Sequence, residues 1–374
     1  MSQNQALHIV FFTEWYPHSK DPQNGVFIQK HAKALAKKHS VVVYHVLSDA
    51  QVKELSGRKT EKKKGRLTEW TFRYPARKKA LGKAEAWKHV FNQIDRVDVV
   101  HLNILNRDCT LWDLWLQKTK IPFVVHEHSS FYLEGYKKNT VWHLSRKRLI
   151  KRAHRVLPVS QGLMIKMKDQ GLHGAYQVVP NIVRIKRSIA RSNRSTPIKL
   201  ISVGDLVNEV KQFDQVLRAL KELEIPFEYS IVGDGKDREE LEEIARALYS
   251  EGLEQKVQFL GRKRQKAVQE MLPEFDLLIS NSAYETFGLV VLEALACGVP
   301  VISRRTGVSE DFIRSSRNGY LIDSDQELSK RVFQFIEEED GFNTKLLSDA
   351  DLDRLSPKMF RRTMKKIYQT IGLL

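Results

Sequence analysis

Strand-like and helical patterns alternate along this sequence, and that alternation is the feature that most restricts its fold. The first series has strand-like runs at 7–12, 41–46, 97–102, 123–127 and 156–159, with a helical pattern at 27–37. Such alternation is typical of parallel strands joined by crossover helices. The first part of the chain is therefore predicted to form a parallel α/β domain.

The alternation stops in a polar, basic stretch at 181–197 and then begins again. The second series has strand-like runs at 199–203 and 227–232 and helical patterns at 213–223 and 237–249. A chain of 374 residues is long enough for two domains of ordinary size. We predict four parts: an N-terminal domain at 1–180, a linker at 181–197, a C-terminal domain at 198–355, and a final helix at 356–374 that could pack back on the N-terminal domain.

Composition places the chain among ordinary folded proteins. Hydrophobic residues make up 42% and charged residues 29% of the sequence, and no apolar run is long enough to span a membrane. The first residues lack a basic leader and a cleavage site, so no secretion signal is expected. Cys109 and Cys297 are too few for a disulfide framework, which favours a reducing compartment. The expected location is the cytosol.

The formal net charge of +17 favours anionic partners, which include nucleic acid, acidic lipid and phosphorylated small molecules. Basic residues gather at 58–83, with eleven Lys or Arg against two Glu, and at 137–155, with no acidic residue. Either stretch could be an ordinary solvated face. Charge alone does not choose among these partners.

Several motif classes lack their required residues. The run Ile231-Val232-Gly233-Asp234-Gly235 ends a strand and opens a helix, but Arg238 stands where a dinucleotide fingerprint needs glycine. No Walker loop, HExxH or paired CxxC is present. The Asp-x-Asp strings at 323–325 and 349–351 precede helical patterns, where Asp commonly caps a helix, so no metal site is predicted.

The most informative segment is 280–303, where Glu285 and Glu293 flank a turn that becomes a helix near Gly288. Eight helical residues rise about 12 Å, which suits a nucleotide sugar lying along the element. The amides of Phe287, Gly288 and Leu289 would meet the diphosphate, because a helix N-terminus binds anions without a metal. A carboxylate such as Glu293 accepts hydrogen bonds from both ribose hydroxyls, although alone it could be a solvent-facing residue.

This segment resembles the E-x7-E signature of the family 4 retaining glycosyltransferases, whose GT-B fold has two facing Rossmann-like domains. Further matches follow in the family's order through nearly the whole chain. They are Trp15-Tyr16-Pro17, Asn24-Gly25-Val26-Phe27, His126-Glu127-His128, Val159-Ser160, Val179-Pro180-Asn181, Val203-Gly204 with Lys211, IVGDG at 231–235, Phe259-Leu260-Gly261 and Asn318-Gly319. One such match is weak, whereas the ordered set is specific.

The resemblance implies a role for each matching residue. Lys211 would bind the donor diphosphate, Glu285 the transferred sugar and Glu293 the ribose. The main chain near Arg262 would meet the base, the Gly204 turn would lie at the donor, and His128 and the Gly25 loop would face the donor from the other domain. Asp205 departs from the family, which usually has Arg there, and this removes one expected phosphate contact unless Asp205 positions Lys211.

Plainer roles stay open for three of these residues. His128 could be a strand-end histidine bonded to backbone, Lys211 a surface lysine at a helix start, and Gly25 only a turn residue. The family needs no metal or other cofactor, because a cation and helix amides stabilise the leaving diphosphate.

The predicted function is transfer of a sugar from a UDP-sugar or GDP-sugar to a glycan or lipid-linked acceptor. One alternative is a nucleotide-sugar epimerase of the same architecture, which needs no acceptor. The other is a nucleic-acid-binding protein, suggested by the charge and by Trp70, Phe72 and Tyr74 alternating along one strand face. Alternating aromatics in a strand more often form a core face, and no recognition motif accompanies these, so no nucleic-acid partner is expected. The sugar, the choice between UDP and GDP, the acceptor and the oligomeric state stay open.

A last pattern concerns the acceptor side. The segment 139–157 is predicted to form an N-capped helix that mixes apolar residues with the cations Arg146, Lys147, Arg148, Lys151, Arg152 and Arg155. Its apolar residues could simply pack on the sheet. Basic residues near an anionic bilayer each contribute about 1 kcal/mol, so this helix could hold the enzyme at the cytoplasmic face of a membrane.

Overall fold

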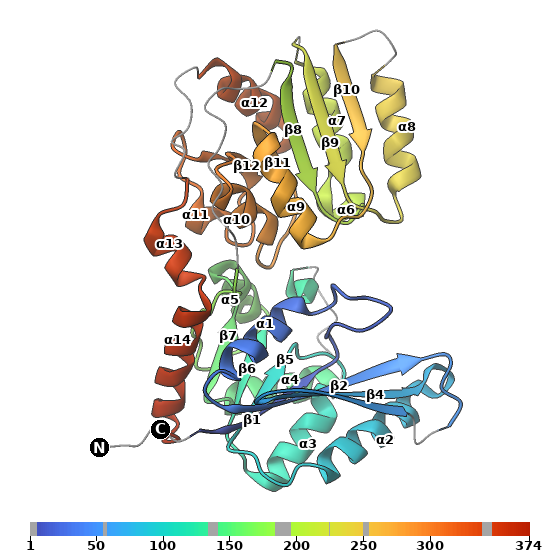
Figure 1. Cartoon of the computed structure of the whole chain (residues 1–374), viewed down its shortest axis with the longest axis vertical. Coiled ribbons are helices and arrows are strands. Elements are labelled where there is room, and N and C mark those ends of the chain that lie inside the picture. The colour runs from blue at the N-terminus through green and yellow to red at the C-terminus, as the bar shows by residue number, and fades with distance from the viewer. Residues whose placement is uncertain are drawn as a thin grey trace. The chain divides into compact units, whose positions relative to one another are not determined.

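The chain divides into two compact units. Unit 1 comprises Met1–Ile182 together with Arg354–Leu374, and unit 2 comprises Val183–Asp353. The computed structural model describes residues 6–54, 58–133, 141–183, 196–223, 225–249, 254–338 and 346–374. Each unit is built on one sheet with helices packed against it (Figure 1).

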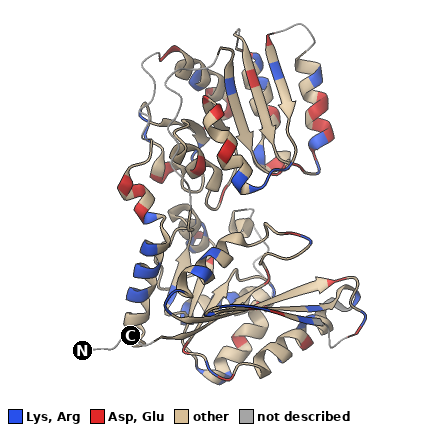
Figure 2. Ribbon diagram, viewed as in Figure 1, with Lys and Arg blue, Asp and Glu red and all other residues tan. Residues whose placement is uncertain are grey.

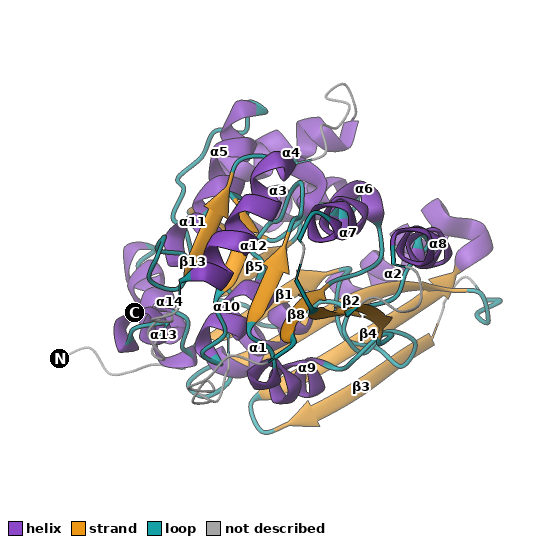
Figure 3. Cartoon of the chain, turned by 90° about the horizontal axis from the view of Figure 1, so that it is seen from above, coloured by secondary structure: helices purple, strands orange, loops and turns teal. Residues whose placement is uncertain are grey.

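Unit 1 contains a seven-stranded sheet in the order β3-β4-β2-β1-β5-β6-β7. Its strands are β1 (His8–Thr13), β2 (Ser40–Asp49), β3 (Arg58–Lys64), β4 (Leu67–Pro75), β5 (Val99–Asn103), β6 (Phe123–Glu127) and β7 (Arg155–Pro158). All neighbouring strands are parallel except β3, which pairs with β4 in the antiparallel sense. The lysine-rich strand β3 therefore forms the outer edge of the sheet (Figure 3).

The helices of unit 1 are α1 (Val26–Leu35), α2 (Lys79–Asn92), α3 (Cys109–Thr119), α4 (Val141–Arg152), α5 (Gln161–Asp169) and the C-terminal α14 (Pro357–Thr370). Short 3-10 turns lie at Ala76–Lys78 and Ser130–Tyr132. Helices α2 and α3 lie on one face of the sheet, and α1 lies on the other with α14 beside it (Figure 1). Phe360, Met364 and Ile367 of α14 are buried in the same core as Ile9 and Phe11 of β1.

Unit 2 contains a six-stranded, wholly parallel sheet in the order β10-β9-β8-β11-β12-β13. Its strands are β8 (Ile198–Val203), β9 (Phe227–Val232), β10 (Gln255–Phe259), β11 (Leu277–Ser280), β12 (Val301–Arg304) and β13 (Gly319–Ile322). Its helices are α6 (Asn208–Lys211), α7 (Phe213–Lys221), α8 (Arg238–Leu248), α9 (Gln265–Met271), α10 (Leu289–Ala296), α11 (Ser309–Phe312), α12 (Leu328–Glu337) and α13 (Asp349–Arg354), with 3-10 turns at Leu272–Glu274 and Asp325–Glu327.

Both sheets reverse their strand order near the middle. In unit 1 the reversal lies between β1 and β5, and in unit 2 it lies between β8 and β11. In open parallel sheets, ligands bind beyond the carboxyl ends of the strands at such a reversal. The loops that follow β8 and β11 are therefore the expected ligand loops of unit 2.

Most of the predicted elements are confirmed. The strands predicted at 123–127 and 227–232 match β6 and β9 residue for residue, and the predicted parallel α/β class is confirmed. Strand β2 runs three residues beyond the predicted end at 46 because its last residues pair with β4, as Asp49 does with Pro75. Most of the predicted linker, 184–195, lies outside the described residues.

One prediction about local structure is wrong. The helix predicted at 139–157 ends at Arg152, and Arg155 begins β7, because the strand pairs with β6 there. Residues 139 and 140, including the predicted cap, lie outside the described residues. The aromatic face of β4 is largely core, as alternating aromatics in a strand usually are: Phe72 and Tyr74 are buried. The nucleic-acid alternative thereby loses its stacking surface.

Candidate functional site

Lys211 and Glu285 meet at the strand-order reversal of unit 2. Lys211 ends the short helix after β8, Glu285 lies in the loop after β11, and Lys211 Nζ forms an ion pair with Glu285 Oε1. The amide of Ala283 donates to the carbonyl oxygen of Val210 at 2.8 Å, which ties the two loops together. The structure thus brings together two residues that are far apart in the sequence.

Helix α10 begins where the sequence predicted. Gly288 is its N-terminal flanking residue, with φ +81°, a left-handed conformation that glycine adopts at little cost. The first amides of a helix have no acceptor within the helix. No described residue accepts a hydrogen bond from the amides of Phe287, Gly288 or Leu289. These amides can therefore serve an anionic ligand.

Glu293 lies on α10 and is buried, with an exposed fraction of 4%. Its Oε1 accepts hydrogen bonds from the side-chain amides of Gln265 and Gln269 on α9, the latter at 3.0 Å. The alternative of a solvent-facing Glu293 is wrong. The two glutamines were missed by sequence reasoning, because a contact between two helices leaves no local pattern.

The loop after β8 contains the position at which the family motif is altered. Asp205 and Arg262 form a 3.0 Å ion pair, with exposed side-chain fractions of 70% and 59%. Among the described residues, Lys211 pairs with Glu285 and Asp205 pairs with Arg262, so Asp205 does not hold Lys211. A Cβ added at Gly204 would lie 3.1 Å from Lys211 Cε, so glycine leaves room for the lysine.

Two further residues support Glu285 and were not predicted. Ser282 Oγ donates a 3.2 Å hydrogen bond to Glu285 Oε1. Gly307, which lies between β12 and α11, has φ +59°, and a Cβ there would lie 2.6 Å from the carbonyl oxygen of Phe287. The amide of Val308 donates to that same oxygen at 2.9 Å. In the sequence, Gly307 just before a short helix was the available indication that this loop makes a tight turn.

In unit 1, Gly25 precedes α1 with φ +60°. A Cβ at Gly25 would collide with the carbonyl group of Trp15, so the loop after β1 folds tightly against the start of α1. The turn role of Gly25 is thus visible in the structure, and a ligand role for Gly25 stays a prediction.

His128 follows β6 and is buried, with an exposed fraction of 4%. Its loop is held by Glu127, whose carboxylate accepts the amides of His128 and Ser129 at 3.0 and 3.1 Å and the hydroxyl of Tyr132 at 2.8 Å. Burial holds the pKa of His128 well below its ordinary value. The imidazole is therefore neutral at pH 7, the form that accepts a proton.

A partly buried charged cluster was not predicted: Glu14 follows β1, Asp108 follows β5 and Lys83 lies on α2. Lys83 Nζ lies 3.0 Å from Glu14 Oε1 and 2.7 Å from Asp108 Oδ1, and Trp87 Nε1 donates to Asp108 Oδ2 at 2.9 Å. Burial raises the pKa of Asp108 to about 6, although the nearby Lys83 opposes the shift. The cluster lies at the strand-order reversal of unit 1, beyond the carboxyl ends of the strands.

The basic face predicted on α4 is smaller than expected. Arg146 is buried: its guanidinium lies 4.5 Å from the Trp142 ring centroid, and its Nε donates to Leu105 O at 2.9 Å. Arg148 and Arg152 pair with the buried Asp113 at 2.7 and 2.8 Å. Figure 2 shows further Lys and Arg along α14.

The other basic stretch, 58–83, includes the edge strand β3, whose described side chains are exposed. Lysine on an edge strand prevents pairing with other chains, so part of this charge has a structural reason. No helix among the described residues has the length and apolar character needed to cross a bilayer.

Comparison with known proteins agrees with this geometry. A family model described as Glycosyltransferase Family 4 matches residues 25–187, and a model described as Glycosyl transferases group 1 matches residues 185–349. The chain belongs to the family 4 glycosyltransferases. The first match includes the Gly25 loop and His128, and the second includes Lys211, Glu285 and Glu293.

Two curated relatives of this glycosyltransferase resemble it over part of their length. N-acetyl-alpha-D-glucosaminyl L-malate synthase of Bacillus anthracis is 30% identical over 45% of this chain and 44% of its own. The lipopolysaccharide core biosynthesis glycosyltransferase LpsE of Rhizobium meliloti is 29% identical over 50% of this chain and 54% of its own. The chain thus matches about half the length of these relatives.

A solved structure resembles the glycosyltransferase over its full length. HepE of Anabaena, crystallised with UDP and glucose, has a TM-score of 0.74 and 17% identity, and the match covers 97% of this chain and 100% of that one. At this level of identity the likeness establishes the fold, which is GT-B.

Proposed function

We propose that this chain is a retaining glycosyltransferase that moves a sugar from a nucleotide diphosphate donor to a glycan or lipid-linked acceptor. The observation that carries the proposal is the pairing of Lys211 and Glu285 beyond β8 and β11, in the unit that also holds the open N-terminus of α10. The UDP and glucose bound to HepE support a nucleotide-sugar donor, and the activities named for the curated relatives support sugar transfer.

In this proposal the ion pair opens when the donor binds. Lys211 turns to the diphosphate, whose negative charge grows as the glycosidic bond breaks, and the amides at Gly288 contribute partial positive charge. Glu285 then contacts the sugar, which acquires positive charge in the transition state. Departure of the diphosphate and attack of the acceptor on the same face of the sugar give retention.

The same charges remove the need for a divalent cation at the diphosphate, so we propose transfer without an essential metal or other cofactor. The test of the whole function is a thermal-shift panel with UDP, GDP and their sugars, since a ligand that binds the folded state raises the melting temperature. One nucleotide should raise the melting temperature, and its sugar, incubated alone, should give no epimer. Formation of an epimer without acceptor would favour the epimerase alternative.

Glu293 provides a prediction about binding. Glu293→Gln keeps an oxygen for Gln265 and Gln269 but loses the charge that holds the ribose, so donor KM should rise about tenfold or more. Because the ribose contact is the same in ground and transition states, kcat should change less. Glu270→Gln on the exposed face of α9 is the matched control. Unchanged donor KM in Glu293→Gln would remove the ribose assignment.

We further propose that the acceptor lies at an anionic membrane surface, which places the enzyme at the cytoplasmic face. The exposed part of α4 supports this, because Val141 and Leu144 are 70% and 56% exposed and are followed by exposed Lys147 and Lys151. A lipopolysaccharide role is named for LpsE. An apolar end followed by cations suits adsorption to acidic lipid.

Sedimentation with vesicles tests this attachment. Wild type should sediment with anionic vesicles at low salt and remain in the supernatant at high salt, because the attraction is screened. Lys147→Gln with Lys151→Gln should weaken binding about tenfold or more, at about 1 kcal/mol for each charge. Lys62→Gln with Lys63→Gln on β3 is the control of equal charge. Equal recovery with anionic and zwitterionic vesicles would exclude the attachment and leave the transfer reaction untouched.

A further inference from the structure

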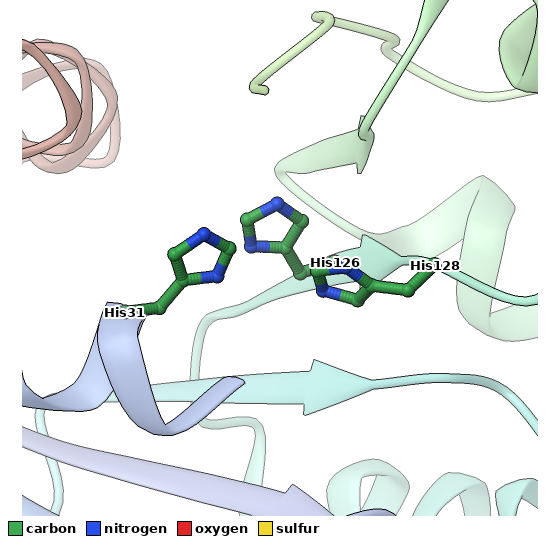
Figure 4. A group of neighbouring side chains, drawn as sticks. All are labelled: His31, His126 and His128. Atoms are coloured by element: carbon green, nitrogen blue, oxygen red, sulfur yellow. The ribbon is translucent and has the colours of Figure 1, made fainter. Parts of the chain in front are cut away.

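Three histidine side chains meet inside unit 1. His31 comes from α1, His126 from β6 and His128 from the loop after β6, and all three are buried (Figure 4). Each offers one ring nitrogen, and these three atoms lie within 4.8 Å of one another. Of the three, only His128 has an expected part in sugar transfer, which is to face the donor as the family resemblance implies.

Most nitrogen atoms of this histidine cluster lack partners. Both ring nitrogens of His31 and Nδ1 of His126 have no hydrogen bond from any described residue. His126 Nε2 lies 3.4 Å from the carbonyl oxygen of Val179, and His128 interacts with the Asn181 side chain. Buried polar atoms are nearly always satisfied, so such a group indicates a ligand that the protein atoms do not supply.

The ring spacing suits one metal ion. A zinc ion about 2.0–2.1 Å from an imidazole nitrogen lies about 3.2 Å from the ring centroid, so two imidazoles on one tetrahedral ion have centroids about 5.2 Å apart. The centroids of His31, His126 and His128 are 4.6, 4.5 and 5.6 Å apart. The His31 and His126 rings are nearly parallel, with an interplanar angle of 4°. Both rings must therefore turn about their side-chain torsions, of which the outer one is soft, before their nitrogens close to about 3.3 Å around one ion.

The surroundings also suit a metal. Metal-bound histidines usually donate their second ring N–H to a carbonyl or carboxylate oxygen. Val179 O lies next to His126 Nε2, and the Asn181 side chain interacts with His128. Phe27 and Phe360 lie 4.4 and 4.3 Å from the His128 and His31 rings and close the site with apolar walls.

We propose that His31, His126 and His128 form a site for one transition-metal ion of the Zn2+ class, with the fourth position left for water or an anion. Three neutral imidazoles in a closed site suit Zn2+, Co2+, Ni2+ or Cu2+ far better than Mg2+ or Ca2+, which prefer oxygen. The ion would have no part in the diphosphate chemistry proposed for unit 2. Because it would occupy His128, binding should slow the transfer reaction, a consequence that rests on the proposed function.

The test uses full-length protein freed of metal by a chelator and dialysed against Co2+ or Zn2+. Wild type should hold one equivalent, and Co2+ should show the intense visible absorption of a tetrahedral site. His31→Gln and His126→Gln should lose the equivalent, whereas His45→Gln, which removes a buried histidine outside the cluster, should keep it. Retention of the full equivalent in His31→Gln or His126→Gln would overturn the three-histidine site.

X-ray absorption at the zinc edge of the wild type needs no variant, so it serves even if a substitution prevents folding. Three imidazoles around zinc would support the proposal, and an all-oxygen shell or no bound zinc would overturn it. These readouts do not depend on activity. If zinc binds and a working transfer assay is unaffected, the proposed role of His128 fails while the metal site stands.

Discussion

Replacing Glu285 with Gln or Lys211 with Met is expected to lower kcat about 100-fold or more. Loss of one preorganised electrostatic partner at a developing charge has about this effect in other enzymes. The donor KM should change less, because both side chains act mainly on charge that appears in the transition state. Steady-state kinetics with a saturating donor measures the effect.

Lys236→Met is the matched control, since this exposed lysine lies after β9 in the same unit. Lys211 and Glu285 also neutralise each other, so a single substitution leaves one unpaired charge that could disturb the loops. The double variant Lys211→Met with Glu285→Gln leaves no unpaired charge and therefore separates the effect on catalysis from the effect on loop stability. Both loops should stay folded in the double variant while kcat stays low. If the double variant regains activity, each single substitution harms the enzyme only by leaving the charge of its partner unpaired. A stoichiometric covalent sugar on Glu285, found by mass spectrometry, would contradict the same-face mechanism.

The second large effect is acid sensitivity confined to unit 1. All twelve histidines precede residue 174, so unit 2 has none. Burial lowers the pKa of His45 to about 3 and that of His101 well below its ordinary value. Below pH 6.5 the unfolded chain protonates these histidines and the folded unit does not, so stability falls as pH falls. Each histidine contributes about 2 kcal/mol of loss between pH 6.5 and 5.0.

Tryptophan fluorescence follows this transition cleanly, because all six tryptophans also lie in unit 1. The urea midpoint of the fluorescence change should fall from pH 7.5 to 5.0, while the part of the circular dichroism change due to unit 2 should move little. His45→Gln should show a shallower pH slope whatever its stability at pH 7.5. Equal pH slopes in wild type and His45→Gln would show that His45 does not drive the loss.

The central parts of the fold and site were predictable because their signals are local. The α/β alternation follows from residue patterns within single strands and helices. The start of α10 was predictable from Gly288, which lies between Glu285 and Glu293. Only the residues around this one turn decide where the helix begins.

Contacts between distant segments were not predictable. Gln265 and Gln269 reach Glu293 only because α9 packs beside α10. Arg146 looked like part of a cationic face, since its neighbours in the helix are Lys147 and Arg148. It is buried because aromatic rings and the Leu105 carbonyl surround its guanidinium.

The histidine cluster shows the same limit. His126 and His128 were visible as a pair in the sequence, but nothing local connected them with His31 on α1. The parallel pairing of β1 and β5 and of β5 and β6 sets the strand positions, and α1 returns over that sheet to bring the third ring to the first two. Only the folded sheet joins these residues.

The central claim is that unit 2 holds a nucleotide sugar between Lys211 and α10. Calorimetric titration of the full-length protein with UDP and GDP tests it most directly. We predict one site for one of the two nucleotides. Its affinity should fall about tenfold or more in Lys211→Met, because the free nucleotide carries the full diphosphate charge that Lys211 meets in the transition state. It should fall as much in Glu293→Gln and stay unchanged in Lys236→Met. Binding of neither nucleotide, or equal affinity in wild type, Lys211→Met and Glu293→Gln, would contradict the claim.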